Sequence, residues 1–473
     1  MTAANLPEFV QEGQLRVAGL PSTITDAIRL TGEMGIPYLW VDVLCIIQEG
    51  DGGADKARQI PIMDAVRGEV KPGLWVALQM TGFDAAQKAS STCNTRARTF
   101  QEAVLSPRLL LFHQGYVTWE CRERVWCEDM STEQGDTPKP ADSTNFIRNK
   151  LQSLAHIDHL GRHDDILRYE LTVQDYTSRE MTYWGDKLNA FAGLGAIYER
   201  QMGTELVFGL PANQLDMALL WSTAGGPSLE RLPDFPSWSW AGWKGAVHYL
   251  SRNHMALSPT SHFWIADKDH HSTGNGRILL RRLVQAWEAD DYVPHDRPVQ
   301  VHPIDPGNRA RYPKVGVSGS LDRSHTQHLD PKLNLSKCLC FENFHSNASH
   351  FSIQDGRKLV LKSTGKVVGG IALDEPLGAA GLDADMELVR LNLCTSGRPS
   401  HTEGESSPES LFPASGLPNM IAGKTFWNSE THMDWCRFLL VKKTGDGSVQ
   451  RKGVSSMIAA ALCDEKQKMC FLS

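Results

Sequence analysis

One carboxylate interrupts the most apolar segment of the chain. Residues Tyr38 to Ile47 are apolar apart from Asp42. An unpaired carboxylate is costly to bury, so Asp42 needs either a partner or a cleft. Arg96 or Arg108 is the structural partner we expect, and a ligand-facing position at the C-terminal end of a strand is the alternative. Asp42, Arg96, Arg98 and Arg108 are therefore candidates for a ligand-binding or structural polar site.

A second carboxylate lies on a predicted helix over Thr95 to Leu105. At roughly 100° per residue, Glu102 is about 140° around the helix from Ala97, outside the apolar stripe. Arg98 lies four residues before Glu102 and can pair with it, which would lower the pKa of the carboxyl. The alternative to a functional role is an ordinary solvated helix position.

Thiols and imidazoles offer weaker candidates for chemistry. Cys45 has no histidine near it in sequence, so we expect a buried core thiol, not a nucleophile. His156, His159 and His163 have the spacing of ligands on a helix, but Gly161 is predicted to end that helix before the third. The sequence therefore predicts no metal site.

Indoles are concentrated in one short segment. Trp238, Trp240 and Trp243 are so close in sequence that they must pack. We expect a packed corner between domains, and the alternative is a binding cage. The segment Gly193-Leu-Gly195 lies inside a helical pattern with no preceding strand, so it does not predict a nucleotide-binding loop.

The segment before Asp42 indicates the fold that positions these residues. Thr23 and Asp26 have capping-box spacing at the start of a predicted helix, and Gly35 ends it. The run Tyr38 to Ile47 then reads as a strand that is apolar on both faces. This order predicts an open α/β sheet with a parallel strand covered by helices. Further elements are predicted as helices over residues 54–68, 145–159 and 187–202, and as strands over 74–80, 109–112, 116–120, 278–284, 359–368 and 438–442.

Bulk properties are those of an ordinary globular protein. The chain has 473 residues, 41% of them hydrophobic, and a net charge of -7, so two or three domains and no nucleic-acid partner are expected. The sequence predicts neither a secretory signal nor a membrane span. Ten scattered cysteines without metal-site spacing indicate reduced thiols in a cytoplasmic protein.

Four blocks in a fixed order resemble the fungal heterokaryon incompatibility (HET) domain family. They are Leu20–Ile28 with Gly35–Gln48, Arg96–Arg108 with Trp119–Arg122, Tyr176–Thr182 with Asp186–Leu188, and Phe235–Trp243. The resemblance implies a HET domain over about residues 15–130 and a helical, Trp-rich extension over 131–250. A β-rich region over 251–473 follows, with a disordered loop predicted near 397–418.

The family resemblance also implies a function. It implies a self/non-self recognition protein of a filamentous fungus that triggers programmed cell death, a form of innate immunity. Self-association or binding to other incompatibility proteins is then expected. The implied fold is similar to that of Toll/interleukin-receptor (TIR) domains, an open parallel sheet of flavodoxin-like type.

Some TIR relatives cleave NAD at the nicotinamide–ribose bond with one glutamate on a helix. The matching element is Thr99-Phe-Gln-Glu102, so the resemblance implies Glu102 as the catalytic residue. NAD would be a substrate, and no cofactor is expected.

Two departures from the family pattern leave alternatives open. The usual first strand, ending in Leu-Ser-Tyr-x-Trp-Gly, has no counterpart before residue 20, and Arg98 stands where the family has Trp. The competing hypotheses are therefore an interaction and signalling module, a TIR-like NAD glycohydrolase, and a truncated, inactive paralogue.

Overall fold

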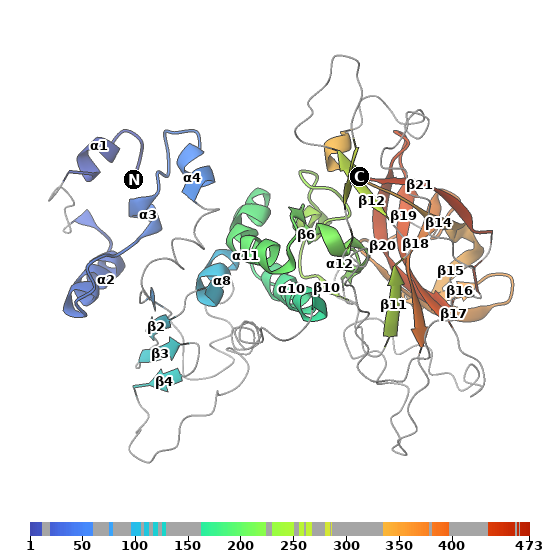
Figure 1. Cartoon of the computed structure of the whole chain (residues 1–473), viewed down its shortest axis with the longest axis horizontal. Coiled ribbons are helices and arrows are strands. Elements are labelled where there is room, and N and C mark those ends of the chain that lie inside the picture. Colours follow the sequence, from blue (N-terminus) through green and yellow to red (C-terminus); the bar gives the residue numbers. More distant parts are fainter. Residues whose placement is uncertain are drawn as a thin grey trace, which may run out of the picture. The chain divides into compact units, whose positions relative to one another are not determined.

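The structure is a computed structural model of the chain. It describes residues 1–11, 19–59, 75–78, 96–105, 108–112, 117–121, 125–128, 162–223, 229–249, 255–259, 262–266, 280–283, 285, 334–377, 381–396, 434–458, 461–462 and 464–473. The chain divides into two compact units (Figure 1). Unit 1 comprises residues 1–159 and 179–201, and unit 2 comprises residues 160–178 and 202–473.

Unit 1 is a mixed α/β structure. Its described helices and strands are α1 (Leu6–Phe9), α2 (Ser22–Glu33), α3 (Asp42–Cys45), α4 (Ala54–Gln59), β1 (Trp75–Leu78), α8 (Ala97–Leu105), β2 (Arg108–Phe112), β3 (Val117–Cys121), β4 (Val125–Cys127), η3 (Trp184–Asp186) and α11 (Lys187–Met202), which ends at the boundary of the unit. The described sheet has the order β1-β2-β3-β4. Strands β1 and β2 are parallel, whereas β2–β3 and β3–β4 are antiparallel.

Several sequence predictions in unit 1 are confirmed. Helices α2, α8 and α11 and strands β1, β2 and β3 lie where the patterns indicated. Gly35 follows the end of α2 with φ 66°, the left-handed conformation that a glycine adopts without steric cost. Helix α4 occupies the first part of the helix predicted over residues 54–68, and residues 145–159 lie outside the described ranges.

The prediction of a strand from Tyr38 to Ile47 is wrong. The segment contains the short helix α3, in which the N–H groups of Leu44 and Cys45 donate to the carbonyl of Val41 at 2.9 and 2.8 Å. Cys45 is exposed, so the expectation of a buried thiol is also wrong. A short apolar run cannot be assigned to strand or helix from periodicity alone, and Asp favours the first turn of a helix over a strand.

Unit 2 begins with one long helix and continues mainly as β structure. Its described elements are α10 (Arg162–Thr177), β5 (Leu206–Val207), β6 (Leu210–Pro211), η4 (Ala212–Gln214), α12 (Leu215–Ala218), β7 (Trp221–Ser222), β8 (Glu230–Arg231), η5 (Trp240–Gly242), β9 (Trp243–Lys244), β10 (His248–Tyr249), β11 (Met255–Pro259), β12 (Phe263–Ala266), β13 (Leu280–Leu283), η8 (Leu335–Lys337), β14 (Leu339–Asn347), η9 (Ala348–His350), β15 (Phe351–Gln354), β16 (Lys358–Leu361), β17 (Lys366–Leu373), β18 (Met386–Ser396), β19 (Asp434–Lys443), β20 (Val449–Ile458) and β21 (Lys466–Leu472). The predicted β-rich C-terminal region is confirmed, and residues 397–433, with the predicted disordered loop, lie outside the described ranges.

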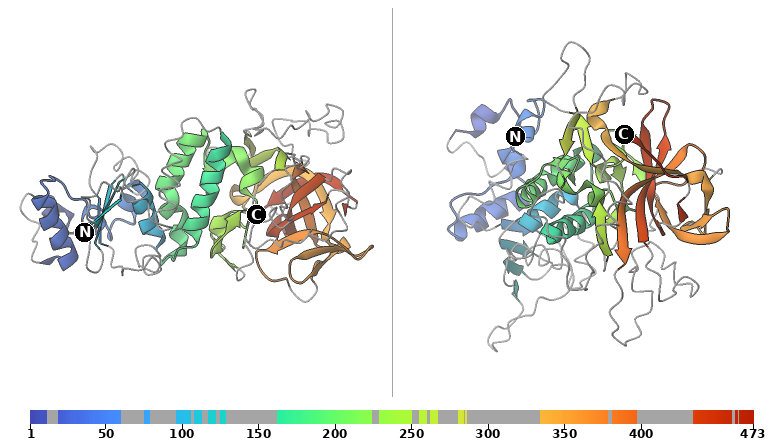
Figure 2. Two further views of the ribbon diagram at one scale, coloured as in Figure 1. Left: turned by 90° about the horizontal axis from the view of Figure 1, so that it is seen from below. Right: turned by 45° about the vertical axis from the view of Figure 1, so that its right-hand side comes forward.

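Five strands of the large sheet in unit 2 form a closed ring. The hydrogen-bonded order is β14-β18-β19-β20-β21, and β21 returns to β14. An odd number of strands cannot close with antiparallel pairs alone, and β20 and β21 supply the parallel pair through Val449 and Leu472. Figure 2 shows these strands in the red and orange part of the chain.

A buried apolar cluster on one side of this sheet forms a core of unit 2. Met386, Leu388, Phe438 and Leu440 alternate along β18 and β19 and pack within it. The single strand predicted over Leu359–Val368 is instead the hairpin of β16 and β17, with Gly365 in its turn at φ 65°. In the described part of the chain, no helix combines the length and the apolar character that a membrane span requires.

Candidate functional site

Helix α8, which carries Glu102, lies in the chain between two parallel strands. Among the described elements, β1, α8 and β2 follow one another as a β-α-β arrangement, and residues 79–95 lie outside the described ranges. Its buried face contains Ala97, Phe100 and Gln101, which are 2%, 1% and 6% exposed. Ala97 and Phe100 of the predicted apolar stripe are therefore buried, whereas Val104 is only partly buried, and the buried face anchors the element that carries the candidate carboxylate.

The buried face of α8 contacts other segments of unit 1. The guanidinium of Arg179 lies 4.4 Å from the centroid of the Phe100 ring. Gly193 of α11 approaches α8 so closely that an added Cβ would be 2.2 Å from Nε2 of Gln101. The Gly193-Leu-Gly195 segment lies inside α11, as predicted, and its first glycine allows this close helix contact.

The structure locates the predicted site residues on separate elements. Asp42 is the first residue of α3, Arg98 and Glu102 lie in α8, and Arg108 begins β2, but their side chains lie outside what the structure describes. Arg96 is exposed just before α8 and forms an isolated parallel bridge with Glu180. The pairing of Asp42 with an arginine and the Arg98–Glu102 pair therefore stay predictions.

The predicted histidine cluster falls largely outside the described residues. His156 and His159 are not among them, and His163 lies in α10 without a described side chain. Within the described ranges, no group of three or more His, Cys, Asp or Glu side chains is placed to hold a metal ion.

The tryptophans of the Phe235–Trp243 segment pack within unit 2. Trp238, Trp240 and Trp243 are each at most 1% exposed, as is Trp221. Their indole N–H groups donate to the carbonyl of Lys337 at 3.1 Å, the hydroxyl of Tyr169 at 2.9 Å, the carbonyl of Ser237 at 2.8 Å and, from Trp221, the carbonyl of Trp238 at 3.0 Å. Because these donors are satisfied inside the protein, packing is confirmed over a binding cage, whereas the expected position between domains stays a prediction.

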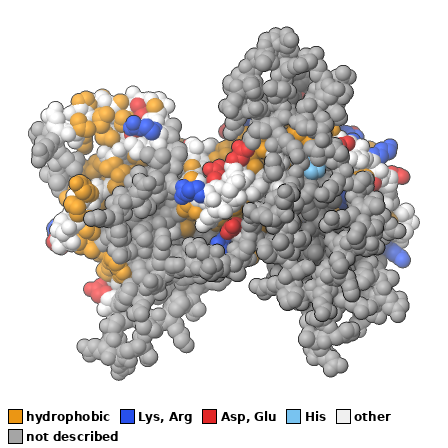
Figure 3. All heavy atoms as spheres, in the orientation of Figure 1, with side chains coloured by type: hydrophobic (Ala, Val, Ile, Leu, Met, Phe, Trp, Pro, Cys, Tyr) orange, Lys and Arg blue, Asp and Glu red, His pale blue; other side chains and the backbone are white. Residues whose placement is uncertain are grey.

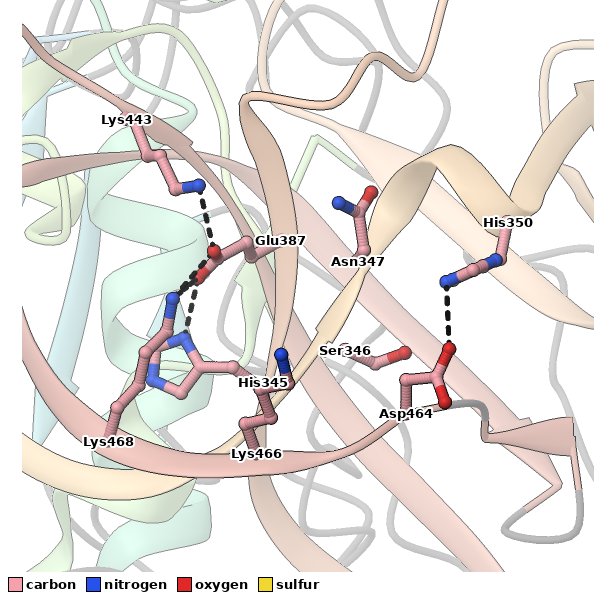
Figure 4. A pocket seen from close by; sticks show the side chains of 9 residues that line it. All are labelled: His345, Ser346, Asn347, His350, Glu387, Lys443, Asp464, Lys466 and Lys468. Atoms are coloured by element: carbon pink, nitrogen blue, oxygen red, sulfur yellow. Dashed lines mark hydrogen bonds and ion pairs between the residues drawn. The ribbon is translucent and has the colours of Figure 1, made fainter.

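A second polar site, which the sequence did not indicate, lies at one end of the strand ring. The carboxylate of Glu387 on β18 contacts His345 Nδ1 at 2.8 Å, Lys468 Nζ at 2.6 Å and Lys443 Nζ at 3.2 Å. Figure 4 shows these three side chains converging on Glu387. His345 and Glu387 are buried, whereas the two lysine side chains are nearly half exposed.

The charge states of this cluster follow from burial and hydrogen bonding. Burial lowers the pKa of His345 more than its hydrogen bond to Glu387 raises it, so the imidazole is neutral at pH 7. Burial alone would raise the pKa of Glu387, but hydrogen bonds from His345 and Lys468 hold it well below its usual range. A neutral imidazole therefore donates from Nδ1 to an ionised carboxylate.

Acidification is expected to destabilise unit 2 through this pair. The pKa of His345 in the folded protein is below its reference value of 6.5. As the pH falls through about 6.5, the unfolded chain therefore binds a proton more readily than the folded protein does, and the free energy of unfolding decreases. The pKa of Glu387 is below 4.5, so the stability that it contributes above that pH is lost on further acidification. Urea unfolding between about pH 7.5 and about pH 4 should show a falling midpoint.

His345→Asn retains a donor for Glu387 but cannot titrate. Its urea midpoint should change less than that of wild type between about pH 7 and about pH 5.5, whereas Glu342→Gln on the same strand should follow wild type. Equal slopes for wild type and His345→Asn would contradict the assignment of this pH dependence to His345.

Sequence reasoning missed this cluster because its members come from four strands that are far apart in the chain. His345, Glu387, Lys443 and Lys468 lie on β14, β18, β19 and β21. Only the register of the ring brings them together. A charged residue inside an apolar strand pattern, as at Glu387 between Met386 and Leu388, was the one available signal.

Comparison with known proteins gives one match. A family model described as "Heterokaryon incompatibility protein (HET)" matches residues 5–127. These residues include β1, α8 and β2, and thus Glu102. Neither a curated protein nor a solved structure matches the chain. The family predicted from the sequence is confirmed: the chain carries a heterokaryon incompatibility (HET) domain at residues 5–127.

Proposed function

We propose that this protein acts in heterokaryon incompatibility as an interaction and signalling module that triggers programmed cell death in the cytoplasm of a filamentous fungus. The HET match over residues 5–127 is the observation that carries this proposal. Association with a second copy is the interaction that we expect to start the response, and other incompatibility proteins are the alternative partners.

Exposed apolar side chains in the HET domain support self-association. Val10, Met34, Tyr38 and Val43 are 72%, 42%, 86% and 46% exposed. Figure 3 shows apolar side chains gathered over the N-terminal part of the chain. Such surface is costly in a monomer and is typical of protein–protein contacts.

Expression in a filamentous fungus tests this proposal. Wild-type protein should self-associate in light-scattering measurements and reduce viability. The double variant Tyr38→Ser, Val43→Ser should lose both properties. Leu167→Ser, which removes a side chain that is 46% exposed in unit 2, is the matched control and should behave as wild type. Killing by a strictly monomeric double variant would contradict self-association as the trigger.

A TIR-like NAD glycohydrolase is the second candidate, favoured by the β-α-β arrangement around α8. A helix between two parallel strands is the unit from which TIR- and flavodoxin-like sheets are built, and Glu102 lies on this helix. Loss of the already cationic nicotinamide needs no general acid. A single carboxylate can stabilise the oxocarbenium-like ribosyl centre and orient the ribose hydroxyls.

NAD consumption by the purified chain separates the two candidates. Under the catalytic proposal, wild type and Glu33→Ala cleave NAD, whereas Glu102→Ala loses at least about 100-fold in rate. If neither wild type nor Glu102→Ala cleaves NAD while both kill cells, the interaction proposal stands without the enzyme. A wild-type protein that neither kills nor cleaves would instead indicate an inactive paralogue.

A further inference from the structure

A polar cavity lies at the end of the strand ring in unit 2. Its volume is about 420 Å³, which is within the range of about 300–1,000 Å³ for small-molecule sites. It is lined by side chains from β14, β18, β19, β21 and the segments next to them: His345, Ser346, Asn347, His350, Glu387, Lys443, Asp464, Lys466 and Lys468. Figure 4 shows this cavity from close by.

Strand register explains why most of these side chains share one face. Asn347 pairs with Glu387, and His345 pairs with Lys466. Lys468 lies two residues beyond Lys466 along β21, so it emerges on the same face. The cavity thus forms where β14 and β19 end and where β18 and β21 begin, and such barrel mouths commonly hold ligands.

The lining carries more positive than negative charge. Three lysines face two carboxylates. Glu387 is held by Lys443, Lys468 and His345, and Asp464 lies 3.7 Å from His350. Among the described residues, Lys466 has no ion-pair partner, so its ammonium group is available to a ligand.

Neutral donors complete the lining. The Oδ1 atom of Asn347 accepts a hydrogen bond from the backbone of Ser349 at 2.8 Å, which leaves its amide N–H groups as donors. In Figure 4, Asn347, Ser346 and the ammonium group of Lys466 lie around the same central space. An excess of donors and positive charge around one space favours an anion.

We propose that this cavity binds a small molecule through a phosphate group. Ammonium groups that approach from different strands suit an anion with several oxygen atoms in different directions. A planar carboxylate would instead be matched by the fork of an arginine, and none is among the described residues that line the cavity. The ammonium groups of Lys443 and Lys468 each have three N–H donors. Some of these donors hold Glu387 in place, and the others would contact the phosphate.

Calorimetric titration of the full chain tests this proposal with inorganic phosphate, AMP, adenosine and acetate as probes. Phosphate and AMP should bind, whereas adenosine and acetate should not. Lys466→Gln removes one charge-assisted contact and should weaken AMP binding about tenfold, which corresponds to about 1.4 kcal/mol. Binding should also weaken as salt increases, because the attraction is electrostatic.

Lys358→Gln is the matched control. Lys358 pairs with Asp355 at 2.6 Å on an exposed turn of unit 2, outside the cavity lining, so this variant should bind AMP like wild type. A urea-unfolding measurement checks that both variants are folded. The proposal is overturned if wild type binds neither phosphate nor AMP, if Lys466→Gln binds as tightly as Lys358→Gln, or if adenosine or acetate binds as tightly as AMP.

Discussion

Replacing Asp374 by alanine is expected to destabilise unit 2 by about 3–5 kcal/mol. Asp374 and Arg451 are both completely buried. Arg451 donates from Nε to Asp374 at 2.8 Å and from Nη1 to the carbonyl of Leu219 at 2.6 Å, and its guanidinium lies 3.3 Å from the centroid of the Trp221 ring. Removing the carboxylate leaves a buried, uncompensated positive charge, which costs far more than the lost hydrogen bonds.

Two further variants separate this mechanism from a general packing defect. Asp383→Ala removes a partner of Lys442 that lies 3.4 Å away and whose side chain is 31% exposed, and should cost less than about 1 kcal/mol. The double variant Asp374→Ala, Arg451→Met removes both charges and should recover most of the loss. Urea unfolding followed by tryptophan fluorescence measures all three. Equal losses in Asp374→Ala and Asp383→Ala would contradict the role of the buried charge.

Local patterns predicted the parts of the molecule that depend on neighbouring residues. The helices α2, α8 and α11 each carry a periodic apolar stripe or a glycine stop, so their positions followed from the chain itself. The density of Trp238, Trp240 and Trp243 predicted packing because three large indoles cannot all be solvated. These inferences needed no knowledge of distant contacts.

Features set by tertiary contacts could not be predicted in this way. The run around Asp42 is too short for its period to separate a helix from a strand, and α3 formed where a strand was expected. Thr364 and Gly365 interrupt the segment read as one strand, and the left-handed conformation of Gly365 turns it into a hairpin. The cavity around Glu387 depends on the register of four strands, which leaves no local signature.

The second large effect is expected at the tryptophan cluster. Replacing Trp240 by alanine should destabilise unit 2 by about 3–5 kcal/mol, because it removes a completely buried indole. The ring of Tyr176 packs edge-on against Trp240 at 5.8 Å between centroids. The Trp240 N–H donates to the hydroxyl of Tyr169, which in turn donates to the carbonyl of Gly209 at 2.5 Å. The loss therefore combines a cavity with a broken hydrogen-bond chain.

A double-mutant cycle isolates the hydrogen-bonded part. Trp240→Phe keeps most of the ring volume, and Tyr169→Phe removes the acceptor. Because both variants break the same bond, the double variant should lose about 0.5–1.5 kcal/mol less than the sum of the single losses. Leu167→Ala, an exposed position on the same helix as Tyr169, should change stability by no more than about 0.5 kcal/mol. Strictly additive losses in urea unfolding would show that Trp240 and Tyr169 act independently, and Trp240 would then contribute through packing alone.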